Sequence, residues 1–103
     1  MAKYTIIHAD GFLSKDGVGY DGLTLSWLPD DILAVQAAAD GSADLEKGVR
    51  STLTITANEL VDDVTSLSWW SNVDTTWQAA YDAEQAAIAA AKKAEEEAAE
   101  SGD

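Results

Sequence analysis

The sequence predicts an α+β protein, in which a small antiparallel sheet is followed by one long C-terminal helix. Four Asp-Gly pairs in the first half separate short runs of alternating apolar and polar residues, a pattern typical of antiparallel strands joined by tight turns. The last third is rich in Ala, Glu, Gln and Lys, which lose little rotamer freedom in a helix. We therefore divide the chain into a β body at residues 1–70 and a helix at residues 71–103.

The β body is expected to hold extended segments separated by turns in which glycine supplies a positive φ. The turns are predicted at Asp10-Gly11, Asp16-Gly17, Asp21-Gly22 and Asp40-Gly41. The extended segments are residues 3–9, 12–15, 18–20, 23–27, 32–36, 45–48 and 51–56. Residues 57–60 are interpreted as a turn or the start of a helical turn, and residues 61–67 stay open between strand and loop. Their order suggests a meander.

Alternation within these segments also predicts the core, with Trp70 and Trp77 closing one side. The expected core side chains are Tyr4, Ile6, Phe12, Val18, Leu23, Leu25, Ile32, Ala34, Leu53, Ile55, Leu60 and Leu67.

The long helix is expected to begin with Asp74 as its N-cap and to stop near Gly102. Its apolar stripe is bulky at Trp77 and Tyr81 and becomes an alanine seam afterwards. We therefore expect the first two or three turns to pack on the body. The rest either projects into solvent or lies in a weak coiled-coil-like seam against another helix.

Composition restricts the partners of this protein. At this length we expect a single domain. The formal net charge of −13 disfavours binding to nucleic acid or to an anionic membrane, and it suits a basic partner. The chain has no cysteine, which excludes disulfides and thiolate metal sites. We see neither a signal peptide nor a membrane span and expect a protein made in a cytoplasm.

No residue pattern indicates catalysis, a cofactor or a metal. His8 is the only histidine and is interpreted as an ordinary surface or strand-edge residue. The nearby acid pairs are Asp30 with Asp31, Asp40 with Asp44, and Asp62 with Asp63, and none follows the spacing of a calcium loop. We therefore expect a protein that is not an enzyme.

The aromatic residues are the strongest candidates for a binding surface. Four tryptophans are many for so short a chain, and exposed tryptophans are frequent anchors of protein interfaces. For Trp27 and Trp69, burial in the core stays open as the alternative. The expected protein-interface residues are Trp27, Trp69, Trp70, Trp77, Tyr81 and Ile88.

Several motifs follow one another along the chain: residues 16–23 (DGVGYDGL), 28–36 (LPDDILAVQ), 40–41 (DG), 45–48 (LEKG), Trp70, and 77–80 (WQAA) at the start of an Ala- and Glu-rich helix. Their order resembles a family of small, uncharacterised tailed-bacteriophage proteins that are encoded near virion and tail-fibre genes. Ala37 departs from the pattern, because an aromatic residue usually follows that glutamine. The resemblance implies a virion-associated or tail-assembly role, and it brings no catalytic residues.

These observations give one function hypothesis and two alternatives. The first is a non-enzymatic structural or adaptor protein of the phage tail or tail-fibre region, located in the virion and made in the host cytoplasm. It would bind other virion proteins or copies of itself as an oligomer or part of a complex. The alternatives are a soluble acidic inhibitor or DNA mimic that acts on a host enzyme, and an assembly chaperone for tail fibres.

Overall fold

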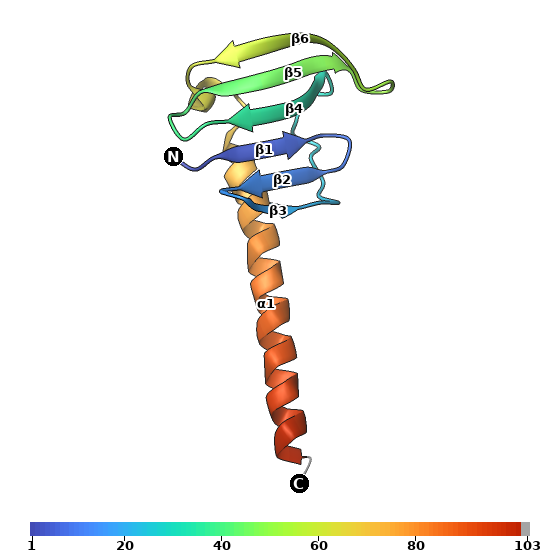
Figure 1. The fold of residues 1–103 in the computed structure, drawn as a ribbon, viewed down its shortest axis with the longest axis vertical. Coiled ribbons are helices and arrows are strands. Elements are labelled where there is room, and N and C mark those ends of the chain that lie inside the picture. The colour runs from blue at the N-terminus through green and yellow to red at the C-terminus, as the bar shows by residue number, and fades with distance from the viewer. Residues whose placement is uncertain (102–103) are drawn as a thin grey trace.

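A computed structural model describes residues 1–101 and confirms the α+β class (Figure 1). Six strands form one antiparallel sheet, and a short 3₁₀ helix leads to a single long α-helix. The elements are β1 (Tyr4–Ile7), β2 (Phe12–Lys15), β3 (Val18–Tyr20), β4 (Ile32–Ala37), β5 (Ala43–Val49), β6 (Thr54–Val61), η1 (Val64–Ser66) and α1 (Ser71–Ser101).

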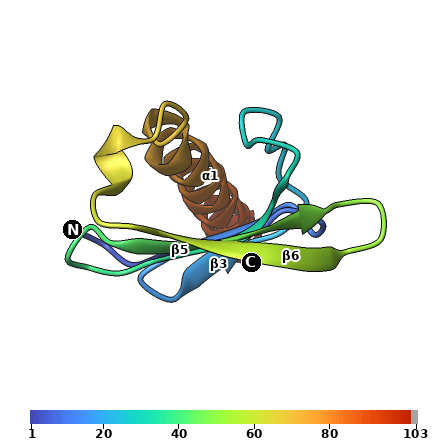
Figure 2. The ribbon, with the colours of Figure 1, turned by 90° about the horizontal axis from the view of Figure 1, so that it is seen from above.

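The strand order is β3-β2-β1-β4-β5-β6, so the sheet consists of two three-strand meanders joined at its centre. A simple meander would place β4 beside β3, but β4 instead pairs with β1. The connection that makes this possible, residues 21–31, carries Leu25 and Leu28 into the core. It lies on the same side of the sheet as α1 (Figure 2). One face of the sheet therefore receives the helix, η1 and this loop together.

The Asp-Gly turns form as predicted. Gly11, Gly17, Gly22 and Gly41 all have a positive φ. Asp16 also has a positive φ, of 49°, so both residues of the two-residue turn between β2 and β3 are left-handed. That is the geometry of a type I′ hairpin, which matches the twist of the strands it joins.

Two segments were predicted wrongly. Residues 23–27 form no strand, because β1 already pairs with β2 on one side and β4 on the other, which leaves this segment as the crossing connection. Residues 57–60 are neither a turn nor helical. They belong to β6, which runs to Val61 because it pairs with β5 along its whole length. The start of the predicted 51–56 strand is a turn, in which Leu53 has φ 55°.

The core lies between the sheet and α1. Its fully buried side chains are Ile6, Leu13, Val35, Leu45, Val64 and Val73. Of the predicted core, Tyr4, Ile6, Leu25, Ile32 and Trp77 are buried, whereas Phe12, Leu23, Ala34, Leu67 and Trp70 are partly exposed. Val18, Leu53, Ile55 and Leu60 are exposed, which corrects their assignment to the core. Leu53, Ile55 and Leu60 lie in β6 or in the turn before it, which the helix does not cover, whereas Val18 lies at the opposite edge of the sheet, in β3.

The helix begins at Ser71, so Asp74 lies in its first turn rather than at its N-cap. The predicted stop at Gly102 lies outside the described residues. Side chains are buried or partly buried as far as Tyr81, and those from Asp82 to Ala98 are exposed. The first turns therefore pack on the sheet as predicted, and the rest projects. The molecule is elongated, with extents of 63 × 31 × 19 Å.

We predict that Leu53→Gly stabilises the protein. A leucine with φ 55° is in the left-handed region that glycine adopts without steric cost, and this leucine buries little surface. The free energy of unfolding in urea should rise by about 0.5–1 kcal/mol. Leu60→Gly is the matched control, because an exposed leucine inside a strand should lose stability when replaced by glycine. Equal losses for both variants would contradict the prediction.

Candidate protein-interaction surface

Asp74 joins the helix to the two strands beneath it. Its Oδ1 accepts a hydrogen bond from the Tyr4 hydroxyl at 2.9 Å and from Lys15 Nζ at 2.7 Å. Tyr4 lies on β1 and Lys15 on β2, and the two residues are cross-strand partners. One carboxylate therefore aligns both strands with the first turn of α1. Lys15 Nζ also lies 5.0 Å from the ring centre of Trp77, within cation–π range.

A second contact holds the next turns of the helix against the edge of the sheet. Trp77 Nε1 donates a hydrogen bond to the Val18 carbonyl of β3 at 2.8 Å. Tyr81 stacks on Trp77 with ring centres 5.0 Å apart, and the ring centre of Tyr20 lies 6.1 Å from that of Trp77. The short edge strand β3 is thus covered by aromatic side chains of α1.

The remaining tryptophans close the other flank of the helix. Trp27 stacks on Trp69 with 6.0 Å between ring centres, and its Nε1 donates to Thr76 Oγ1 at 3.0 Å. The rings of Trp70 and Tyr4 are nearly perpendicular, with 5.3 Å between their centres. The connection before β4 and the segment before α1 are thereby bound to the helix.

These contacts decide where the predicted interface residues lie. Trp69 and Trp77 are buried in the core, which is the alternative left open for Trp69 and the core position expected for Trp77, and neither indole is exposed as part of a binding surface. Their indoles are buried because they supply the packing between α1 and the sheet. Trp27, Trp70 and Tyr81 are partly buried against that core. Ile88 is exposed, at 53%, on the projecting part of the helix.

The sheet face opposite the helix has no covering layer in the described chain (Figure 2). We call it the open face. Exposed or partly exposed side chains from alternate strand positions form it, namely Thr5, Ile7, Phe12, Ser14, Ala34, Gln36, Asp44, Glu46, Asn58 and Leu60. Leu60 is 80% exposed, and Ile55, which pairs with Gly48 farther along β6, is 52% exposed. Large apolar side chains therefore meet solvent on this side of the sheet.

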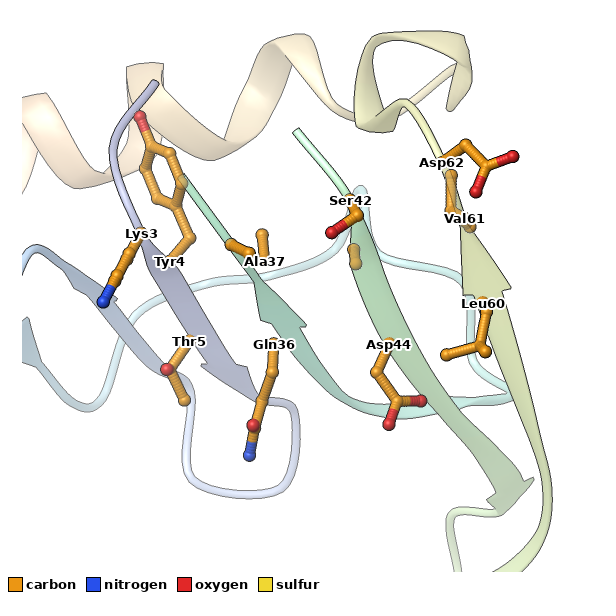
Figure 3. A pocket seen from close by; sticks show the side chains of 12 residues that line it. Lys3, Tyr4, Thr5, Gln36, Ala37, Ser42, Asp44, Leu60, Val61 and Asp62 are labelled. Atoms are coloured by element: carbon orange, nitrogen blue, oxygen red, sulfur yellow. The ribbon is translucent and has the colours of Figure 1, made fainter. Parts of the chain in front are cut away.

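A shallow depression of about 570 Å³ extends over one end of the sheet and is bordered by open-face residues (Figure 3). Thr5, Gln36 and Asp44 point away from the helix, whereas Tyr4 and Ala37 point toward it. Asn58 Nδ2 donates to Asp44 at 3.0 Å beside it. The floor mixes polar and apolar groups and is wide and open, which suits contact with a protein surface better than enclosure of a small molecule.

Sequence reasoning missed this surface because it assigned Ile55 and Leu60 to the core. The widths of the sheet and of the single helix could have indicated that part of the sheet stays uncovered. A sheet of six strands is about 24 Å across from the first strand axis to the last at about 4.8 Å per strand, while one helix is about 10 Å wide. The chain offers a single long helix, so part of the sheet had to stay uncovered.

His8 was predicted as a surface or strand-edge residue, and its burial corrects the surface alternative. It follows β1, and its Nδ1 lies 2.8 Å from the Ile32 carbonyl oxygen, which can only accept a hydrogen bond. Nδ1 therefore carries the proton. The backbone N–H of His8 donates to the Leu33 carbonyl, so the residue extends the pairing of β1 with β4. The buried His8 therefore joins the end of β1 to the start of β4 through these two hydrogen bonds.

The charges that join helix and sheet have shifted pKa values. Hydrogen bonds from Lys15 and then Tyr4 lower the pKa of Asp74 below its usual value. Burial, followed by the Asp74 hydrogen bond, raises the pKa of Tyr4. The Asp74 hydrogen bond raises the pKa of Lys15. All three shifts favour the neutral phenol, the ammonium and the carboxylate that form the contact.

Within residues 1–101, His, Asp and Glu side chains form no group of three or more able to hold a metal ion. None of the described helices combines the length and hydrophobicity needed to cross a bilayer.

Comparison with known proteins gives no relative for this fold: no protein-family model, no curated protein and no solved structure matches the chain. The class of protein is therefore defined by its own geometry, a six-stranded antiparallel sheet with one covered face and one projecting helix.

Asp74→Ala should weaken the protein by about 1–2 kcal/mol in urea unfolding, because the partly buried Tyr4 hydroxyl and the Lys15 ammonium lose their common acceptor. Asp82→Ala is the control. This carboxylate accepts only from Gln78 Nε2 on the exposed part of the same helix, and its loss should cost no more than about 0.5 kcal/mol. Equal effects would show that Asp74 does not join helix and sheet.

Stability should fall at both ends of the pH range. Because the folded pKa of Asp74 is lowered, its contribution is full above about pH 4 and is lost as pH falls through the folded pKa. The raised pKa values of Tyr4 and Lys15 give a contribution that is full below about pH 10 and is lost at higher pH. Thermal unfolding from pH 2 to pH 11 measures both limbs, and Asp74→Ala should flatten the acid limb.

Proposed function

We propose that this protein is a non-enzymatic structural or adaptor protein that binds other proteins of a tailed-bacteriophage particle, in its tail or tail-fibre region. The resemblance of residues 16–23 and 28–36 to small phage proteins suggests the setting. The geometry of the open face and of α1 supports the mode of action.

The observation that carries the proposal is the exposed apolar surface at β6 and the open face. Ile7, Ile55 and Leu60 are each more than one-third exposed, and nothing in the described chain covers them. Large exposed apolar side chains set among polar groups on an uncovered sheet are typical of surfaces that bind other proteins.

The projecting helix supports the same function. Residues 82–98 extend away from the sheet over about 25 Å at about 1.5 Å per residue. Ile88 is the one large apolar side chain there, between alanines and charged residues. A helix of this kind can place the sheet at a fixed distance from a partner, or lie against a second helix along its alanine seam.

Mass spectrometry of purified particles tests the setting. We expect the chain in mature virions, with cross-links from Lys3, which borders the depression at the open face, to a tail or fibre protein. Recovery with fibre protein during assembly but not from particles would replace this proposal with an assembly chaperone. Recovery of a host nucleic-acid enzyme from lysate, with no virion protein, would replace it with an acidic inhibitor.

Leu60→Lys and Ile88→Lys identify the surface that is used. Both leave the core intact because the replaced side chains are exposed. We expect Leu60→Lys to reduce incorporation into particles several-fold, since it places a charge in the apolar contact. Unchanged incorporation of both variants would contradict binding through either surface.

A further inference from the structure

The strand β6 is a long unpaired edge of the sheet. It has eight residues, about 27 Å at about 3.4 Å per residue, and it pairs only with β5. Seven of its eight residues are exposed and the last is partly buried. An edge strand presents backbone N–H and carbonyl groups to which another strand can bind.

The two edges of this sheet differ in their protection. The opposite edge, β3, has three residues, and its Val18 carbonyl already accepts the Trp77 indole. β6 contains no proline, lysine or arginine, the residues that commonly prevent strand addition at an edge. Its register shift lies toward the start of the strand, next to Gly48, and the pairing from Ala57 to Val61 is regular.

The charge around β6 is acidic. Asp44 and Glu46 lie on the open face of the neighbouring strand, and Asp62 and Asp63 follow β6 directly. Lys47 is on the same strand as the first two, but it pairs with Glu59. A segment that approaches this edge therefore meets an excess of carboxylates, in a chain with a net charge of −13.

We propose that β6 binds an extended basic segment of a partner protein, which adds to the sheet as a new edge strand. This inference rests on the proposed function and names the chemistry of the partner. Backbone hydrogen bonds supply the affinity, and alternating side chains supply the selectivity. The partner segment carries lysine or arginine at every second position, on the side of the open face.

The geometry explains this pattern. A strand beside β6 lies about 10 Å from β5, which is two strand spacings. A lysine or arginine on the open face can cover Leu60 with its aliphatic stem and bring its charged end toward Asp44, the cross-strand partner of Leu60. On the other face, small β-branched residues fit beside Glu59 and Val61.

A second copy of this chain fits the edge less well. It would bring a further net charge of −13, and two β6 strands would place their flanking acids near one another. Paired about a two-fold axis at Glu59, they would set two like charges opposite one another, which is destabilising. Charge complementarity therefore selects a basic partner.

The test uses the full chain and a blocked peptide, Thr-Lys-Val-Lys-Val-Lys-Thr, followed by backbone NMR and amide hydrogen exchange. We expect saturable binding that shifts the amides of residues 54–61 and slows exchange of those that face outward. A glutamate version of the peptide should not bind. An isomer with three contiguous lysines keeps the charge but loses the alternation, and it should bind about tenfold more weakly.

Matched variants separate strand addition from simple charge attraction. Leu60→Lys and Val18→Lys change the net charge equally, and both replace exposed apolar residues on edge strands. Leu60→Lys should weaken peptide binding about tenfold while Val18→Lys leaves it unchanged, because only the first lies on the β6 edge. Thermal unfolding of both variants checks that the fold is retained, and the NMR map of the unaltered chain tests the site without any mutation.

Equal binding of the isomer, or shifts spread over other acidic surfaces, would overturn the inference. So would sedimentation showing a dimer paired through β6 that the peptide does not displace. If the peptide fails while the chain is found in particles, the inference falls and the proposed function stands. If the peptide binds β6 while the chain is absent from particles, the phage setting falls and the inference stands.

Discussion

The packing of three helical turns on one face of the sheet is the interaction on which this structure depends. Asp74, Trp77 and Tyr81 follow one side of α1 and meet β1, β2 and β3, while Val73 is fully buried between them. Six strands alone would expose both faces and could bury little apolar surface. The helix supplies the second layer, and the aromatic side chains around it widen the contact beyond the width of a single helix.

Because one helix forms the second layer, large parts of the sheet stay uncovered. The helix covers the half of the sheet formed by β1, β2 and β3, so the outer part of β6 remains in solvent, as does the whole open face (Figure 2). The helix also extends beyond the sheet, and its side chains from Asp82 to Ala98 are exposed. The second layer of the structure is a single helix that is narrower than the sheet and longer than it. Its narrowness leaves apolar residues of the sheet exposed, and its length makes it project into solvent.

The charges at the contact between helix and sheet also differ from those on the rest of the surface. The contacts at the helix join opposite charges and hydroxyl groups that are held close together, as the lowered pKa of Asp74 and the raised pKa of Tyr4 indicate. Elsewhere, carboxylates outnumber basic side chains, and Lys47 and Arg50 are already paired. An acidic surface with an open strand edge selects for a basic, extended ligand more strongly than for a copy of itself.

The sequence by itself determined the α+β class, the four glycine turns, three of the six strands nearly to the residue, and the docking of the first helical turns. Turn chemistry and helix propensity act over a few residues, so they can be recognised locally. Only the tertiary structure decided that β4 pairs with β1, that Trp69 is buried, and that Ile55 and Leu60 are exposed. Alternation shows that two faces differ, but which face is covered depends on where a helix distant in sequence lies.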